Sequence, residues 1–257
     1  MIDLHTHILP YFDDGARSPA EAVAMARVAA ADGITHVVAA PHIESLLGFD
    51  IRLRALPRSA DDLQRELQAA GVAVTIVVAA EVHMAEPLVK AVEPGSPLTV
   101  GGRGRHVLLE PPFGALPRRA RAFVETLAER GITAIIAHPE RCAGICKEPR
   151  LMEDLAAAGA LAQITADSLL APSGDPARVT AELLLAHGLA QFIASDAHDP
   201  ERRPPILSRA LAAAAALLGE ARARPLVEDN PRIVIEGGHV PLQGTALSSR
   251  SGGEPDE

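Results

Sequence analysis

The chain has 257 residues, of which 48% are hydrophobic and 22% charged, and its formal net charge is −9. This acidity, together with one Tyr, five Phe and no Trp, argues against a nucleic-acid partner, because such proteins bind phosphates with basic surfaces and stack bases on aromatic rings. No apolar run approaches the ~18 residues that cross a bilayer, and no basic segment precedes an apolar core at the N-terminus, so we expect a cytoplasmic protein without membrane insertion.

The first half of the chain alternates apolar runs with helical patterns. The run that begins at Ile2 predicts a strand, and further strands are expected over residues 35–40, 72–80 and 106–109. Ser18, Pro19 and Glu21 are typical of a helix start, so a helix is predicted from Ser18 to Asp32, where Gly33 ends it. Other helices are expected over residues 59–70 and 86–92, and residues 48–58 are expected to form an irregular loop.

The second half repeats this alternation. Strands are predicted over residues 132–137, 160–165 and 191–195. Helices are predicted over residues 117–130, 148–158 and 175–187, and from 204 to the mid-230s with a break near 229–231. We expect one domain over residues 1–242 and a tail, 243–257, whose Ser, Gly, Pro and acidic residues predict disorder.

Seven strand-then-helix units predict an α/β fold with parallel strands. Each helix then serves as the crossover between two neighbouring strands. The chain length and the uniformly apolar strands favour a barrel of about seven strands. Periodicity leaves an open, doubly wound sheet as the alternative.

Side chains that bind metals follow the ends of these strands. His5 and His7 are separated by one residue, so they point to the same face of the first strand and can hold one ion. Asp14 lies in the loop that follows. The other candidates lie at the carboxyl ends of later strands: His42, Glu81, Glu110, His138, Asp196 and His198. Because the carboxyl ends of parallel strands meet at one rim, we expect all of them to converge.

Each of these residues also has a structural interpretation when it is taken alone. Glu81 or Glu110 could begin a helix, His138 could be a packed core imidazole, and Asp196 could form a turn. Their combination favours a metal site, and so many ligands exceed the roughly four to six that one ion takes, so a multinuclear site is predicted. Nitrogen and oxygen ligands without thiolate favour Mn, Fe or Zn. The remaining histidines are assigned to structure or surface: His36, His83, His106, His187 and His239.

Two arginines stand close to these candidates in the sequence. Arg141 follows His138, and Arg203 follows His198. A guanidinium matches phosphate oxygens as a fork, so we expect both arginines to bind a phosphate group. Arg202 is the alternative to Arg203.

The two cysteines do not suggest a different chemistry. Cys142 and Cys146 have no second pair, which favours free thiols over a closed zinc site or a disulfide. A cysteine-nucleophile phosphatase would need Cys-x5-Arg, but Glu148 and Met152 occupy the positions where that arginine would stand. A covalent cysteine mechanism is therefore excluded.

These candidates lie in short motifs that follow one another along the chain. The motifs are His5-Thr6-His7, Asp13-Asp14-Gly15, Pro41-His42, Ala80-Glu81, Leu109-Glu110, His138-Pro139-Glu140-Arg141, Ser195-Asp196-Ala197-His198 and Arg203-Pro204-Pro205. From residue 2 to about 236 the chain resembles the PHP (polymerase and histidinol phosphatase) superfamily. More narrowly, it is similar to the bacterial manganese-dependent tyrosine phosphatases of capsular and exopolysaccharide operons. It departs from their pattern at Ala80, where Gly is usual, and at Pro111-Pro112 after Glu110.

The resemblance implies a distorted seven-stranded β/α barrel of PHP type that holds three divalent metal ions, with Mn expected and Fe or Zn as alternatives. Carried over by motif, one ion would be held by His5, His7, Glu81 and Asp196; a second by Glu81, Glu110 and His138; and a third by Asp14, His42 and His198. Arg141 and Arg203 match the phosphate-binding arginines. The implied substrate is a phosphotyrosine protein, namely a bacterial tyrosine autokinase that regulates capsular or exopolysaccharide synthesis and export. A homo-oligomer is compatible with the resemblance.

The expected reaction is hydrolysis of a phosphomonoester by a metal-activated water, with no phosphoenzyme. Three other functions are considered. A small-molecule phosphatase of the histidinol phosphatase kind would hydrolyse histidinol phosphate in preference to a phosphotyrosine peptide. A nuclease is disfavoured by the acidity of the chain. A non-catalytic regulator of the kinase would be expected to have lost metal ligands.

Overall fold

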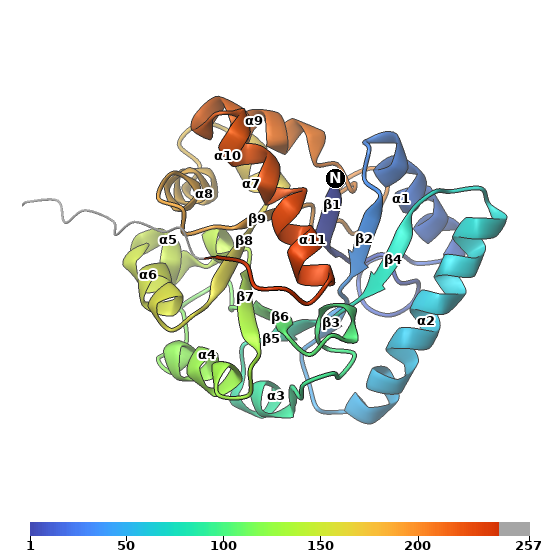
Figure 1. Cartoon of the computed structure of the whole chain (residues 1–257), viewed down its shortest axis with the longest axis horizontal. Helices are drawn as coiled ribbons and strands as arrows, with labels where there is room; N and C mark the ends of the chain where they lie inside the picture. Colours follow the sequence, from blue (N-terminus) through green and yellow to red (C-terminus); the bar gives the residue numbers. More distant parts are fainter. Residues whose placement is uncertain (242–257) are drawn as a thin grey trace, which may run out of the picture.

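The computed structural model describes residues 1–241, so the predicted tail at 243–257 and the domain boundary at 242 lie outside the described residues. Figure 1 shows strands near the centre of the molecule and helices arranged around them. This is the predicted α/β arrangement. Within residues 1–241, no helix is both long enough and apolar enough to span a membrane.

All strand pairs are parallel, and they form two sheets. The first sheet joins β1 (Ile2–Thr6), β2 (His36–Ala39) and β4 (Thr75–Val78) in that order. The second sheet has six strands in the order β3 (His42–Ile43), β5 (Glu81–His83), β6 (His106–Glu110), β7 (Thr133–Ala137), β8 (Leu161–Thr165) and β9 (Phe192–Ala194).

Two of the predicted strands are each divided between the sheets. The strand expected over residues 35–40 becomes β2 and β3, separated at Pro41, which has no N–H to donate to a ladder. The strand expected over residues 72–80 becomes β4 and β5, and Val72 stays outside because its N–H bonds back to the Leu67 carbonyl at 2.9 Å. Each divided segment, β2 with β3 and β4 with β5, still counts as one position in the order of strands.

The contact between β1 and β9 joins the two sheets without a regular ladder. One bridge pairs Thr6 with Ala197. The buried Asp3 carboxylate accepts hydrogen bonds from the Ser195 N–H at 2.9 Å and the Ser195 hydroxyl at 2.5 Å. The pairing among residues 1–241 therefore runs through seven strand places as two sheets, and not as one continuous ladder around a closed ring.

The helices that cover the strands are mostly those predicted. Ser18 begins the first of them as expected, since its hydroxyl accepts the Glu21 N–H at 3.2 Å. The longer helices are α1 (Pro19–Ala31), α2 (Phe49–Ala69), α3 (Glu86–Ala91), α4 (Ala120–Ala128), α6 (Arg150–Ala157), α8 (Pro176–Ala186) and α9 (Ser208–Leu218). Shorter ones are α5 (Ala143–Lys147), α7 (Ala166–Leu170), α10 (Glu220–Ala223), α11 (Asp229–Ile235) and the 3₁₀ turns η1 (Val100–Gly102), η2 (Pro139–Arg141) and η3 (Arg224–Leu226).

The irregular loop predicted over residues 48–58 is wrong, because α2 begins at Phe49 and continues through Pro57. A proline inside a helix removes one backbone hydrogen bond and costs stability. This cost is offset by an apolar stripe that packs against the strands. The stripe consists of Leu56, Ala60, Leu63 and Leu67, all buried.

The C-terminal helical region has two breaks, and the second lies directly before residues 229–231, where one break is predicted. Gly219 has φ 83° and separates α9 from α10. Residues Val227 and Glu228 then separate η3 from α11, which begins at Asp229. Asp229–Asn230–Pro231 is thus the start of a helix, where a proline is tolerated because the first N–H groups have no partner within the helix.

A hydrophobic cluster between the strands joins residues from both sheets to α11. The cluster includes Leu4, Val38, Ala79, Leu108, Ile135, Leu161, Phe192 and Val234. Figure 1 shows α11 in front of the strands, and the Ile2 N–H donates to the Val227 carbonyl at 2.8 Å. The C-terminal segment therefore covers the amino ends of the strands and leaves the carboxyl ends free for a site.

Candidate metal centre

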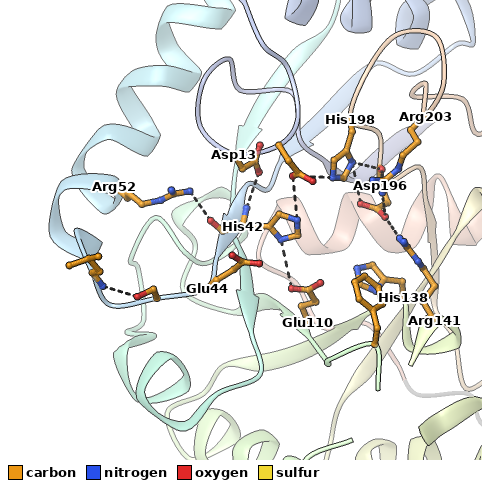
Figure 2. Close-up of a pocket in the computed structure, with 14 residues that line it drawn as sticks. Asp13, His42, Glu44, Arg52, Glu110, His138, Arg141, Asp196, His198 and Arg203 are labelled. Carbon is orange, nitrogen blue, oxygen red and sulfur yellow. Dashed lines mark hydrogen bonds and ion pairs between the residues drawn. The ribbon is translucent and has the colours of Figure 1, made fainter. Parts of the chain in front are cut away.

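The nine predicted ligand side chains come together at the carboxyl ends of the strands. Their ligand atoms fall into four overlapping groups, and within each group all these atoms lie within 4.8 Å of one another. The groups are His7, Asp14, His42 and His198; His5, His7 and Glu81; His5, His138 and Asp196; and His42, Glu81 and Glu110. Figure 2 shows part of this arrangement, with His42, Glu110, His138 and His198 turned towards a common space.

His5 and His7 are held so that one nitrogen of each faces the same point. Nδ1 of His5 donates to Gln163 Oε1 at 2.9 Å, and Nδ1 of His7 donates to Asp13 Oδ2 at 2.7 Å. The two Nε2 atoms then lie 3.1 Å apart. In neutral rings both present lone pairs to one another, which a cation between them would satisfy, and an oxygen behind each ligating histidine is the usual support of such sites.

Glu81 lies at the centre of the cluster and is fully buried. Its Oε1 accepts a hydrogen bond from His138 Nε2 at 2.8 Å. Its Oε2 lies 2.8 Å from His42 Nδ1 and 3.3 Å from His5 Nε2, but both Glu81 Oε2 and His42 Nδ1 are buried without an aligned hydrogen bond. Unpartnered buried polar atoms are costly, so these atoms fit a cation better than they fit each other.

The charges of the cluster favour a bound cation. Burial lowers the pKa of His5 and His7, but Glu81 acting on His5 and Asp13 acting on His7 overcome this and raise these pKa values to about 9 and about 10. Burial opposes ionisation of Glu81, yet the charge of His5 and hydrogen bonds from His138 keep the pKa of Glu81 well below its usual range. The cluster thus stabilises positive charge, which a metal can supply in place of protons.

His198 is already suited to act as a neutral ligand. Burial and the charge of His7 lower its pKa to about 4. Its Nδ1 donates to the Asp196 carbonyl at 2.9 Å, and its Nε2 lies 3.4 Å from Asp14 Oδ1. The lone pair on Nε2 is therefore free for a cation that the nearby Asp14 carboxylate could also bind.

Arg141 and Arg203 approach the cluster from two sides, as Figure 2 shows. Each guanidinium lies 2.6 Å from the same oxygen, Asp196 Oδ2. Both side chains are about one third exposed, with values of 32% and 35%, and both line the cavity. Arg202 does not line this cavity and lies instead in a neighbouring one.

The cavity over the cluster has a volume of about 590 Å³. Its walls carry the two arginines and six of the nine candidate ligands: Asp14, His42, Glu110, His138, Asp196 and His198. His83, assigned to structure from the sequence, lies outside the four groups, although its Nδ1 is 3.6 Å from Glu110 Oε2.

Several residues that support the site were not assigned a role from the sequence. Asp13 stands in the Asp13-Asp14-Gly15 motif, and it accepts hydrogen bonds from His7 and from the His42 N–H at 3.0 Å. Glu140 is fully buried in the turn after His138 and accepts the Thr165 N–H at 2.9 Å. Arg52 donates to the carbonyls of Phe12 and His42, both at 2.9 Å. The motifs signalled Asp13 and Glu140, whereas no pattern signalled Arg52 in a segment predicted to be a loop.

Comparison with known proteins places this geometry in a family. The chain is 32% identical over 203 residues to the tyrosine-protein phosphatase YwqE of Bacillus subtilis, covering 79% of each chain. It is 26% identical over 250 residues to the tyrosine-protein phosphatase CpsB of Streptococcus pneumoniae, covering 91% of this chain and 98% of that one. It also matches a crystal structure from work on YwqE and CpsB, described there as metal-dependent tyrosine phosphatases, with a TM-score of 0.86, 27% identity, and coverage of 97% and 100%. Residues 1–236 match the family described as capsular polysaccharide synthesis, CpsB/CapC, and the chain belongs to that family.

Proposed function

We propose that this protein is a metal-dependent protein-tyrosine phosphatase. The observation that carries the proposal is the buried Glu81 carboxylate at the centre of nine ligand-type side chains, with two arginines on the same cavity. A cluster of this kind suits hydrolysis of a phosphomonoester, because the substrate brings negative charge that cations and guanidinium groups can bind. The relatives named as tyrosine phosphatases support the same reaction.

We assign three divalent ions to the cluster, with manganese as the expected metal. His5, His7, Glu81 and Asp196 would hold one ion, Glu81, Glu110 and His138 a second, and Asp14, His42 and His198 a third. Two of the four groups support this division: one contains Asp14, His42 and His198, and another contains His5, His7 and Glu81. The other two groups place His138 beside His5 and Asp196, and His42 beside Glu81 and Glu110, so the three proposed sites adjoin one another. Bound ions would supply positive charge to the phosphoryl oxygens and acidify the attacking water.

The residues of the chain then bind and orient the phosphoryl group. Arg141 and Arg203 would each offer N–H groups to its oxygens, because both guanidiniums are fixed by Asp196 and both side chains line the cavity. Such fixed donors stabilise the charge that develops in the transition state. A phenol leaves with a pKa near 10, so a strong general acid is not required.

The physiological substrate that we propose is a phosphorylated bacterial tyrosine kinase that regulates capsular or exopolysaccharide synthesis. Family membership supports this class of substrate. We place the reaction in the cytoplasm, because protein kinases use ATP there. The proposal also includes a homo-oligomer as a possible assembly of the chain. We further propose that the strands form a distorted seven-stranded barrel, supported by the cluster that joins both sheets.

The test is phosphate release from a phosphotyrosine peptide after chelation and add-back of single metals. Chelation should abolish release, manganese should restore it, and His138→Ala should lower it by more than about 100-fold, as expected for loss of a ligand and of its contact with Glu81. Full activity of the chelated protein, or no activity with any metal, would contradict the proposal.

Histidinol phosphate in the same assay decides between the two phosphatase functions. We expect kcat/KM for the peptide to exceed kcat/KM for histidinol phosphate. The reverse preference would favour the small-molecule phosphatase. A protein that binds the kinase but releases no phosphate would favour the non-catalytic regulator.

A further inference from the structure

Phe113 places an exposed aromatic ring on the wall of a cavity that is otherwise mostly charged. The residue is 56% exposed and lines the cavity together with Arg141 and His138. The chain has only five Phe and one Tyr. An aromatic ring left in water forfeits the free energy that its burial would give, so its position at this cavity calls for an explanation.

The backbone that carries the ring is held firmly. The Phe113 carbonyl accepts the Ala143 N–H at 2.7 Å, and the next carbonyl, of Gly114, accepts the Gly144 N–H at 2.9 Å. Pro111 and Pro112 before it restrict the chain further. A side chain at Gly144 would come within 2.9 Å of the Leu116 amide nitrogen, which shows how closely this loop packs on α5. The backbone that carries the ring is therefore held in place by its contacts with α5.

The ring lies beside the groups proposed to hold the phosphoryl group. The guanidinium carbon of Arg141 is 5.0 Å from the centre of the Phe113 ring. The rings of Phe113 and His138 are 6.0 Å apart and nearly parallel, at 18°. A phosphoryl group bound by Arg141 would therefore have its ester oxygen, and whatever that oxygen carries, next to the exposed part of the Phe113 ring.

We propose that Phe113 is a specificity-determining residue that stacks on the aryl ring of phosphotyrosine while Arg141 binds the phosphoryl group. This inference rests on the proposed function, since it concerns the substrate of the same site. Offset stacking between two aromatic rings is favourable, whereas an alkyl phosphate gains little from the same surface. Phe113 thus selects aryl phosphates over alkyl phosphates by binding.

The test compares two phosphonates that differ only in the ring, phenylphosphonate and methylphosphonate, by calorimetry on the manganese-loaded protein. Phe113→Ala should weaken phenylphosphonate binding about 10-fold and change methylphosphonate binding by less than about twofold. With the phosphotyrosine peptide, KM should rise and kcat should stay nearly constant, because stacking acts alike on the ground state and the transition state.

Two further variants make the test specific. Phe113→Leu keeps an apolar side chain without a ring face and should also lose the preference for phenylphosphonate. Tyr11→Asn removes the other strongly exposed aromatic residue, which is 75% exposed and does not line this cavity; Asn tolerates the φ of 63° found at this position. This control should keep wild-type binding of both phosphonates.

The outcomes separate this inference from the proposed function. Equal weakening of both phosphonates, or none, in Phe113→Ala would overturn the role of Phe113 even if the wild type releases phosphate from the peptide. A ring-dependent loss of binding in a protein that releases no phosphate would support the role of Phe113 and contradict the phosphatase function.

Discussion

Asp13 shows how a residue outside the predicted ligand set determines the geometry of the site. Its carboxylate accepts hydrogen bonds from His7 Nδ1, the Gly15 N–H and the His42 N–H. Burial raises the pKa of Asp13, but the hydrogen bond and the charge of His7 outweigh it and lower this pKa to about 2. The ionised carboxylate therefore fixes the ring of His7 and the backbone of His42 at once, at neutral pH.

We predict that Asp13→Ala lowers the affinity for manganese by about 10- to 100-fold, the usual loss when the partner of a ligating histidine is removed. Calorimetric titration with manganese measures this affinity. Asp62→Ala, at an exposed position on α2, is the matched control and should bind as the wild type does. Unchanged affinity in Asp13→Ala would show that His7 is held by other contacts.

The two adjacent arginines allow a direct comparison. Arg203 contacts Asp196 and lines the cavity, whereas Arg202 lines a neighbouring one. Arg203→Ala should lower kcat/KM for a phosphotyrosine peptide by about 100-fold, as does loss of a fixed donor to a developing oxyanion. Arg202→Ala should stay within about twofold. A larger effect from Arg202 than from Arg203 would reverse the assignment.

At the scale of secondary structure, two of the proposed ligands stand in backbone turns that no sequence pattern predicts. His138 follows β7 with φ 33°, and Asp196 follows β9 with φ 54°. Such left-handed backbone is usually found at Gly or Asn, and in other residues it tends to mark functional sites. Helix caps such as Ser18 could be predicted because the signal is local, whereas α2 could not, since its stability comes from an apolar face packed on other elements.

The stability of the fold is expected to depend on pH through His106, the first residue of β6. Burial, assisted by the charges of His239 and Arg105, lowers the pKa of His106 to about 4 from the ordinary 6.5. Between these values the unfolded chain binds a proton that the folded chain does not, so stability is lost as pH falls from about 6.5 to about 4, by up to roughly 3 kcal/mol.

We therefore predict that His106→Gln loses less stability than the wild type across this pH window. Urea unfolding at pH 6.5 and pH 4.5 measures the difference, and His187→Gln, at the partly exposed residue that follows the last turn of α8, is the control. Equal losses in wild type and His106→Gln would show that the folded protein binds the proton at His106.

At the scale of the whole molecule, the order of the elements and the convergence of the nine side chains follow from the alternation of strands and helices. Parallel strands with helical crossovers must place their carboxyl ends at one rim, so ligands as far apart in sequence as His5 and His198 could be expected to meet. The division of the strands at Pro41 and the joint between Asp3 and Ser195 could not be predicted, because both depend on pairing across the fold. The same holds for Arg52 and Phe113, which become part of the site only through tertiary contacts.

The proposed metal centre requires that Glu81 lies among several bound cations. The most direct measurement is anomalous diffraction from a crystal of the manganese-loaded protein. We expect three anomalous peaks within ligand distance of the nine side chains, two of them contacting Glu81. A loaded crystal with no anomalous density within ligand distance of Glu81 would contradict it.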